Sequence, residues 1–160
     1  GTPTEPVSDI AVGVAAAVAP DYIPDEETRM AVLREFDRIR SPEEIESVLD
    51  GVRDRFGPAP PSVAQLAKLF FLKYELGALG LSSVQRVDGH LLLKPRDMKV
   101  FERAVKPLDI DLRVITPRRA HWVLPKGIDK PDLVLDYLYQ SVIACRKPSA
   151  KRKSRARRGK

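Results

Sequence analysis

The spacing of apolar residues between positions 25 and 80 predicts three consecutive helices. Apolar side chains recur there every three or four residues, as they do on the buried face of an amphipathic helix. The third helix is apolar on almost all sides, so it is expected at the centre of the fold. The inward positions are Met30, Leu33, Phe36 and Ile39, with Val32 on the flank, then Ile45, Val48, Leu49, Val52 and Phe56, then Val63, Leu66, Leu69, Phe70, Phe71, Leu72, Tyr74, Leu76 and Leu79.

Residues typical of helix ends lie at the borders of these segments. The acids at positions 25–27 suit the positive end of the first helix dipole. Residues 41–44, Ser-Pro-Glu-Glu, form a capping box with proline in the first turn, and Ser62 is expected to cap the third helix in the same way. Gly57 is expected to end the second helix in the left-handed conformation, and Pro58 prevents its continuation.

After Gly80, which is expected to end the third helix, alternating apolar and polar residues predict strands in place of helices. Asp88-Gly89 is the dipeptide most typical of a tight β-hairpin turn. Four strands follow from this pattern, at residues 84–87, 90–93, 110–114 and 120–124.

Two further helices are predicted, one between the strand pairs and one after them. The first follows the capping residue Asp97, and its inward residues are Met98, Phe101, Ala104 and Val105. The second begins at Asp129 and ends near Pro148, with the inward residues Leu133, Val134, Tyr137, Leu138, Ser141 and Val142. The predicted fold is therefore of the α+β class, with a three-helix segment packed on a small mixed or antiparallel sheet and two further helices, in the order ββαββα.

Proline content and charge divide the chain into three parts. Four prolines interrupt residues 1–24, which favours an extended arm or an edge strand over a helix. We expect this arm to arrive from another part of a longer protein. The domain is expected at residues 25–146, with a helical half at 25–80 and an α/β half at 81–146, and residues 147–160 are expected to be a disordered basic tail.

The net charge of +6 is concentrated at the C-terminal end of the chain. Residues 146–160 contain nine Lys or Arg and no acid, which leaves more acidic than basic side chains in the preceding part. The tail has no aromatic residue to stack on bases, so it would bind DNA through phosphates and without sequence specificity. A solubilising tail without a partner is the alternative. The candidate contacts are Lys151, Arg152, Lys153, Arg155, Arg157 and Arg158.

Motifs for catalysis and for metal or nucleotide binding are missing from the sequence. There is no phosphate-binding glycine loop and no nucleophile elbow. His90 and His121 lie in predicted strands without a nearby acid and nucleophile pattern, and Cys145, the only cysteine, has no metal-ligand spacing. We therefore expect no catalytic activity, cofactor or metal for this chain. One cysteine, no signal sequence and no long apolar run indicate an intracellular protein that does not enter a membrane.

A charged stripe lies on the second predicted helix, opposite its apolar face. Helical geometry places Glu43, Ser47, Asp50 and Asp54 on this outer side. Such a stripe is usually a solvated surface, and Asp54 could form no more than a local ion pair with Arg55. Spacing alone therefore does not distinguish a partner site from an ordinary surface.

The sequence contains three short motifs, namely Tyr-Ile-Pro-Asp at residues 22–25, Thr-Arg at 28–29 and Asp-Arg-Phe-Gly at 54–57. Together they resemble the C-terminal domain of bacterial transcription-repair coupling factors, the Mfd family. The resemblance covers most of residues 7–143. It implies a non-catalytic regulatory domain of a cytoplasmic DNA translocase, whose separate motor domains use ATP and Mg²⁺. In this family the translocase displaces stalled RNA polymerase and recruits UvrA, and the C-terminal domain hides the UvrA-binding domain of the same protein until polymerase is engaged.

By position, the family's docking contact falls on Asp54 and Arg55, and a further acidic family position falls on Gly51. Because a glycine cannot supply an ion pair, either Asp50 or Glu46 replaces the missing acid or the contact is weaker in this protein. The resemblance therefore implies an interface of Asp50, Gly51, Asp54 and Arg55 with the UvrA-binding domain, and indirect links to UvrA and RNA polymerase. The alternative function is a nucleic-acid-binding accessory module that acts through the basic tail.

Overall fold

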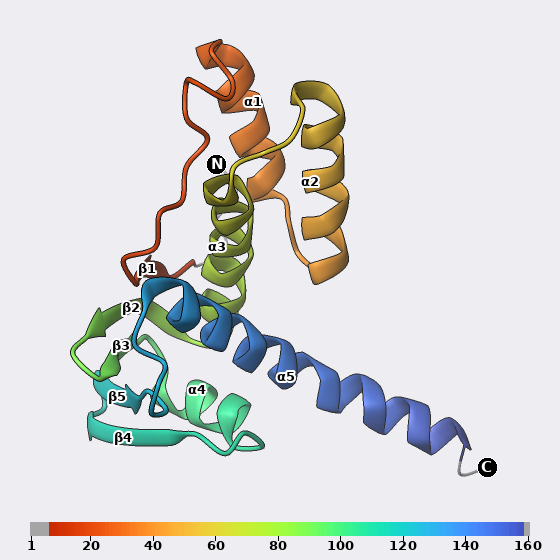
Figure 1. Ribbon diagram of the computed structural model, residues 1–160. Helices are drawn as coiled ribbons and strands as arrows, with labels where there is room; N and C mark the ends of the chain where they lie inside the picture. The colour runs from red at the N-terminus through yellow and green to blue at the C-terminus, as the bar shows by residue number, and fades with distance from the viewer. Residues whose placement is uncertain (1–6, 159–160) are drawn as a thin grey trace, which may run out of the picture.

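The computed structural model describes residues 7–158, and the side chains of residues 7–146. This part of the chain contains five helices and one five-stranded mixed sheet, as the predicted α+β fold requires (Figure 1). The helices are α1 (Glu26–Asp37), α2 (Pro42–Phe56), α3 (Pro61–Ala78), α4 (Met98–Val105) and α5 (Pro131–Arg158). The strands are β1 (Asp9–Ala11), β2 (Leu81–Val87), β3 (His90–Pro95), β4 (Asp111–Thr116) and β5 (Arg119–Val123).

The sheet has the strand order β1-β2-β3-β5-β4. The hairpin at Asp88-Gly89 joins β2 to β3, and a second hairpin joins β4 to β5, so these four strands are antiparallel as predicted. Strand β1 lies parallel to β2, with Ile10 opposite Val84. It forms one edge of the sheet, and β4 forms the other.

The N-terminal arm is extended and packs against the rest of the domain over residues 7–24. The backbone N–H of Ser8 donates to the carbonyl of Lys73 at 2.9 Å, and Val12 and Ile23 are completely buried. The hydroxyl of Tyr22 donates to the carbonyl of Gly57 at 2.7 Å. These contacts hold the arm on the same core as the helices.

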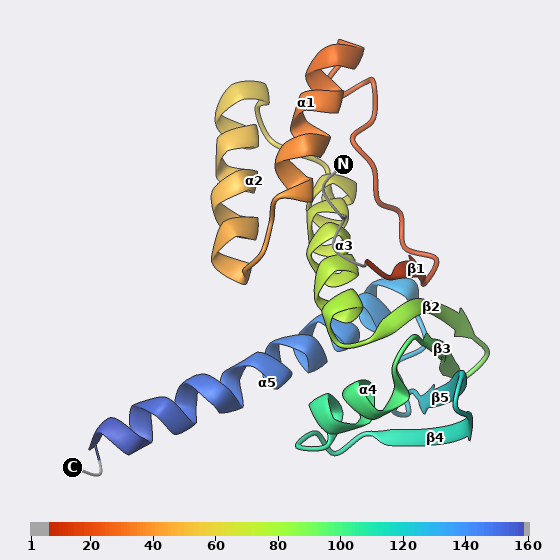
Figure 2. The ribbon, with the colours of Figure 1, turned by 180° about the vertical axis from the view of Figure 1, so that it is seen from behind.

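The helical half and the α/β half share one hydrophobic core. Its largest buried side chains come from both halves, among them Phe36 of α1, Phe71 of α3, Phe101 of α4 and Trp122 of β5. Helix α3 is central, as its apolar sequence predicts, and it contacts α1, α2, α5 and the strands β1 and β2. Figures 1 and 2 show that α5 passes along the junction of the two halves.

Arg146 fastens α5 to the helical half. Its guanidinium donates to the carbonyl of Arg40 at 3.1 Å, forms an ion pair with Glu75 and lies 5.6 Å from the centre of the Phe71 ring. Burial raises the pKa of the Glu75 carboxyl, while Arg146 and Arg40 oppose this rise. The contact closes the core between α1, α3 and α5.

Two predicted helix ends differ from the structure. Helix α3 begins at Pro61, and the residue before it, Pro60, offers no side-chain cap, so the predicted cap by Ser62 is wrong. Proline has no N–H to satisfy, and it fits the first turn of a helix without a cap. Gly57 has φ 86° and ψ −173°, which is an extended conformation open almost only to glycine and not the predicted left-handed one.

One predicted inward residue on each of two helices is exposed in the structure. Met30 is 47% exposed, and α1 buries Val32, predicted on the flank, together with Phe36, which was predicted inward. Leu133 is 42% exposed, while Leu135 is buried on α5. When a helix carries apolar residues on more than one side, packing against the neighbouring elements decides which side is buried. Successive side chains of a helix point about 100° apart, so neighbouring positions differ in burial.

Helix α5 continues past Pro148 to Arg158, where an end near Pro148 and disorder of residues 147–160 were expected. Lysine, arginine and alanine, which make up most of this segment, all favour helix. Residues 159–160 and the side chains of the six predicted DNA contacts, Lys151, Arg152, Lys153, Arg155, Arg157 and Arg158, lie outside the described part.

Candidate functional site

The charged stripe of α2 is held outward by the packing of the opposite side of the helix. Ile45, Leu49 and Val52 are buried against the core, as predicted. The four stripe residues are all exposed: Glu43, Ser47, Asp50 and Asp54. Both views of the molecule place α2 on the outer side of the helical half, away from the sheet (Figures 1 and 2).

Both ends of α2 are fixed by hydrogen bonds. The hydroxyl of Ser41 accepts from the backbone N–H of Glu44 at 3.2 Å, which is the predicted N-terminal cap. At the other end, the N–H of Gly57 donates to the carbonyl of Arg53 at 2.8 Å. The stripe is therefore displayed on a helix with little freedom to fray.

Arg55 makes an ion pair with a residue that the sequence did not point to. Its Nη2 donates to Oε2 of Glu35 at 2.9 Å and to Oε1 at 3.2 Å, and its Nε donates to the carbonyl of Gly51 at 3.0 Å. The guanidinium also lies 5.3 Å from the centre of the Phe56 ring. The ion pair joins α2 to α1 and contributes about 0 to 1 kcal/mol, since both side chains are more than one-third exposed.

The other candidate residues have different surroundings. Asp50 pairs with Arg53, one turn further along α2, at 3.3 Å. Asp54 has no hydrogen bond or ion pair with any side chain in the described part of the chain, so the local pair with Arg55 does not form. At Gly51 an added Cβ would meet no atom within 4 Å, and space alone does not require a glycine there.

The two histidines stack on the open face of the sheet. In β3 and β5, alternate residues such as Leu91 and Trp122 are buried, and the residues between them face away from the core. The rings of His90 and His121 lie on this outer face, with centroids 4.2 Å apart. Partial burial lowers the pKa of His121, and the nearby His90, Arg119 and Arg113 lower it further.

This environment predicts a measurable titration of His121. We expect its pKa below the ordinary 6.5 in a two-dimensional NMR titration of the imidazole resonances. The stability that depends on this group is complete above pH about 6.5 and is lost as the pH falls through the lowered pKa, because the unfolded chain then binds the proton more readily. In His90→Gln the pKa of His121 should rise toward its ordinary value. A value at or above 6.5 in the unsubstituted protein would contradict the prediction.

Two further kinds of reactive group in the described part are the Cys145 thiol and possible metal ligands. Burial, with a contribution from Glu75, raises the pKa of the Cys145 thiol, so the sulfur stays protonated and unreactive. Among the residues that the structure describes, no three His, Cys, Asp or Glu side chains gather closely enough to hold a metal ion. The same residues form no helix long and apolar enough to cross a membrane.

Comparisons with known proteins agree on the family and the fold. A family model described as the TRCF domain matches residues 12–103. Among solved structures, the crystal structure of the C-terminal domain of a transcription-repair coupling factor is similar, with a TM-score of 0.71 and 18% sequence identity over 91% of this chain and 97% of that chain. At this identity the likeness shows the fold. A comparison with curated proteins finds no match. Since the matched residues make up more than half of the chain and include α1, α2, α3 and the first part of α4, this chain belongs to the TRCF domain family of transcription-repair coupling factors.

Proposed function

We propose that this chain is the regulatory C-terminal domain of a bacterial transcription-repair coupling factor. It docks on the UvrA-binding domain of the same protein and covers the surface that UvrA needs until RNA polymerase is engaged. The ATP-driven motor lies in other domains of that cytoplasmic protein. The observation that carries this proposal is Asp54, an exposed carboxylate near the end of a well-capped helix, without a side-chain partner among the described residues.

Arg55 supports the same contact in a different way. Its Nε and Nη2 are occupied by Gly51 and Glu35, while Nη1 makes no hydrogen bond within the described residues. A guanidinium carries five N–H donors, so Nη1 can donate to a partner carboxylate while the other contacts persist. Glu35 thus orients the arginine, and Asp54 presents the opposite charge one residue away.

The contact of Asp54 and Arg55 with the UvrA-binding domain, here called the latch, is expected to be weak enough to open. An ion pair at the rim of an interface contributes about 0 to 1 kcal/mol, so several must act together. A complete switch between covered and uncovered states needs about 5.5 kcal/mol of differential binding by polymerase or DNA. Gly51, which replaces an acid of the family pattern, removes one potential ion pair and favours an easily opened latch.

The test is binding of this chain to the separate UvrA-binding domain of the same coupling factor. Asp54→Lys should weaken binding by about tenfold or more, because it replaces an attraction by a repulsion at a charged interface. Glu43→Lys is the matched control, since it makes the same charge change on the same exposed stripe at the other end of α2. The dissociation constants are measured by isothermal titration calorimetry at low salt, since separated domains lack the effective concentration of linked ones. Equal binding by wild type and Asp54→Lys would place the contact elsewhere.

A further inference from the structure

A second surface with the properties of a binding site lies at the opposite half of the molecule, along β4. This strand has a partner, β5, on one side only. The backbone N–H and C=O groups of its other side therefore have no strand partner among the described residues. Free strand edges are the places where extended peptides add to a sheet through main-chain hydrogen bonds.

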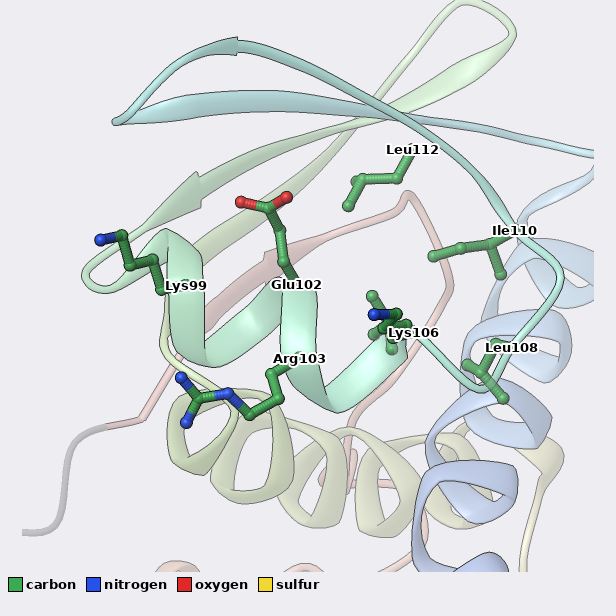
Figure 3. A pocket seen from close by; sticks show the side chains of 8 residues that line it. Lys99, Glu102, Arg103, Lys106, Leu108, Ile110 and Leu112 are labelled. Atoms are coloured by element: carbon green, nitrogen blue, oxygen red, sulfur yellow. The ribbon is translucent and has the colours of Figure 1, made fainter.

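Two clefts lie between β4 and the neighbouring helix α4. The first has a volume of about 580 Å³, and its apolar lining residues are Val105, Leu108, Ile110 and Leu112. Figure 3 shows Leu108, Ile110 and Leu112 beside α4. The second has the same volume, about 580 Å³, and is lined by Met98, Val114, Ile115 and Pro117 among others. Lys99 and Glu102 line both, so the two clefts form one groove along α4 and β4, here called the edge groove.

Apolar side chains of β4 remain open to solvent beside this groove. Val114 is 46% exposed and Ile115 is 53% exposed. They are neighbours on a strand in which only Leu112 is partly buried. An uncovered apolar strand edge is a liability for a soluble protein unless a partner covers it.

The charges around the edge groove favour an acidic partner. Five basic side chains line it, namely Arg96, Lys99, Arg103, Lys106 and Arg118. Arg96 donates to the carbonyl of Gly77 at 3.0 Å, and none of the five makes a side-chain ion pair within the part of the chain whose side chains are described. Of the acids that line the groove, Asp97 caps α4 by accepting from the N–H of Val100 at 3.2 Å, and Glu102 stands between the basic residues. The groove is therefore positive, although the chain before position 146 has more acidic than basic residues.

We propose that the edge groove binds an extended acidic segment of a partner protein, which adds to the sheet as a strand beside β4. Main-chain hydrogen bonds to the free edge hold the segment, and its alternate side chains point toward α4. Among these inward side chains, apolar ones enter the two clefts and carboxylates pair with the basic side chains of the rim. The site is separate from Asp54 and Arg55, which lie on α2 in the other half of the molecule (Figure 1).

The test uses a fluorescein-labelled peptide of eight residues in which two glutamates alternate with two valines, so that each face of the strand carries both residue types. Binding to this chain is measured by fluorescence anisotropy. The double substitution Arg103→Glu and Lys106→Glu should weaken binding by about tenfold or more. Lys126→Glu, an exposed lysine outside the groove, is the control and should leave binding nearly unchanged. A peptide N-methylated at alternate residues, which cannot form the ladder of main-chain hydrogen bonds, should also lose binding.

Three results would overturn the proposal. The first is no binding up to about 1 mM peptide. The second is binding that survives either N-methylation or the double substitution. The third is concentration-dependent self-association of this chain in sedimentation equilibrium that Val114→Lys abolishes, since the edge groove would then be an interface between two copies.

Discussion

Replacing Trp122 by alanine lowers the free energy of unfolding by about 3 to 5 kcal/mol, the usual range for truncation of a large buried aromatic residue. Trp122 is 1% exposed and lies where α4 and α5 meet the sheet. Its ring centre is 6.4 Å from that of Phe101 and 5.7 Å from that of Tyr137. Its Nε1 also donates to the hydroxyl of Tyr137 at 3.0 Å, so truncation leaves both a cavity and an unpaired hydroxyl.

The measurement is urea denaturation followed by far-ultraviolet circular dichroism, because Trp122 is the only tryptophan and its fluorescence is lost in the variant. Trp122→Phe is the control: it keeps most of the apolar volume and should cost clearly less than the alanine variant. Because the two halves share one core, both variants should unfold in a single transition. A loss below about 1 kcal/mol for alanine would contradict the packing described for this residue.

Features set by neighbouring residues could be predicted from the sequence. The Ser41 cap, the Asp88-Gly89 hairpin and the central position of α3 depend on chemistry within a few residues, and all three are confirmed. The exposure of Asp54 also follows from helical periodicity alone. Local pattern therefore predicted the fold class and the outward face of α2.

Features set by contacts between distant parts of the chain could not be predicted. Periodicity predicted Met30 inward and Val32 on the flank of α1, whereas packing against the rest of the core exposes Met30 and buries Val32. The ion pair of Arg55 with Glu35 joins two helices, so it depends on how they lie together. Likewise, alternation in residues 110–114 predicts a strand but does not distinguish an edge strand from a central one. The edge groove therefore could not be predicted before the strand order was known.

Gly80 is the position where a single methyl group should destabilise the fold most. Its φ is 94°, and a Cβ placed there would lie 2.9 Å from the carbonyl oxygen of Asp97. That segment cannot move aside easily, because the Gly80 carbonyl accepts from the N–H of Arg96 at 2.6 Å and from the N–H of Asp97 at 3.2 Å. The conformational cost of about 1 to 2 kcal/mol and an overpacking cost of similar size predict a loss of about 3 kcal/mol for Gly80→Ala.

Two other glycines separate these contributions in the same urea titration. Gly57 also has a positive φ, 86°, but an added Cβ there meets no atom within 4 Å, so Gly57→Ala should show the conformational cost alone. Gly51 lies inside α2 with open space, so Gly51→Ala should raise stability by about 0.5 to 1 kcal/mol. Equal losses for Gly80→Ala and Gly57→Ala would mean that the contact with Asp97 adds nothing. A larger loss at Gly80 would show that the start of α4 is held firmly against the end of α3, which fixes one wall of the edge groove.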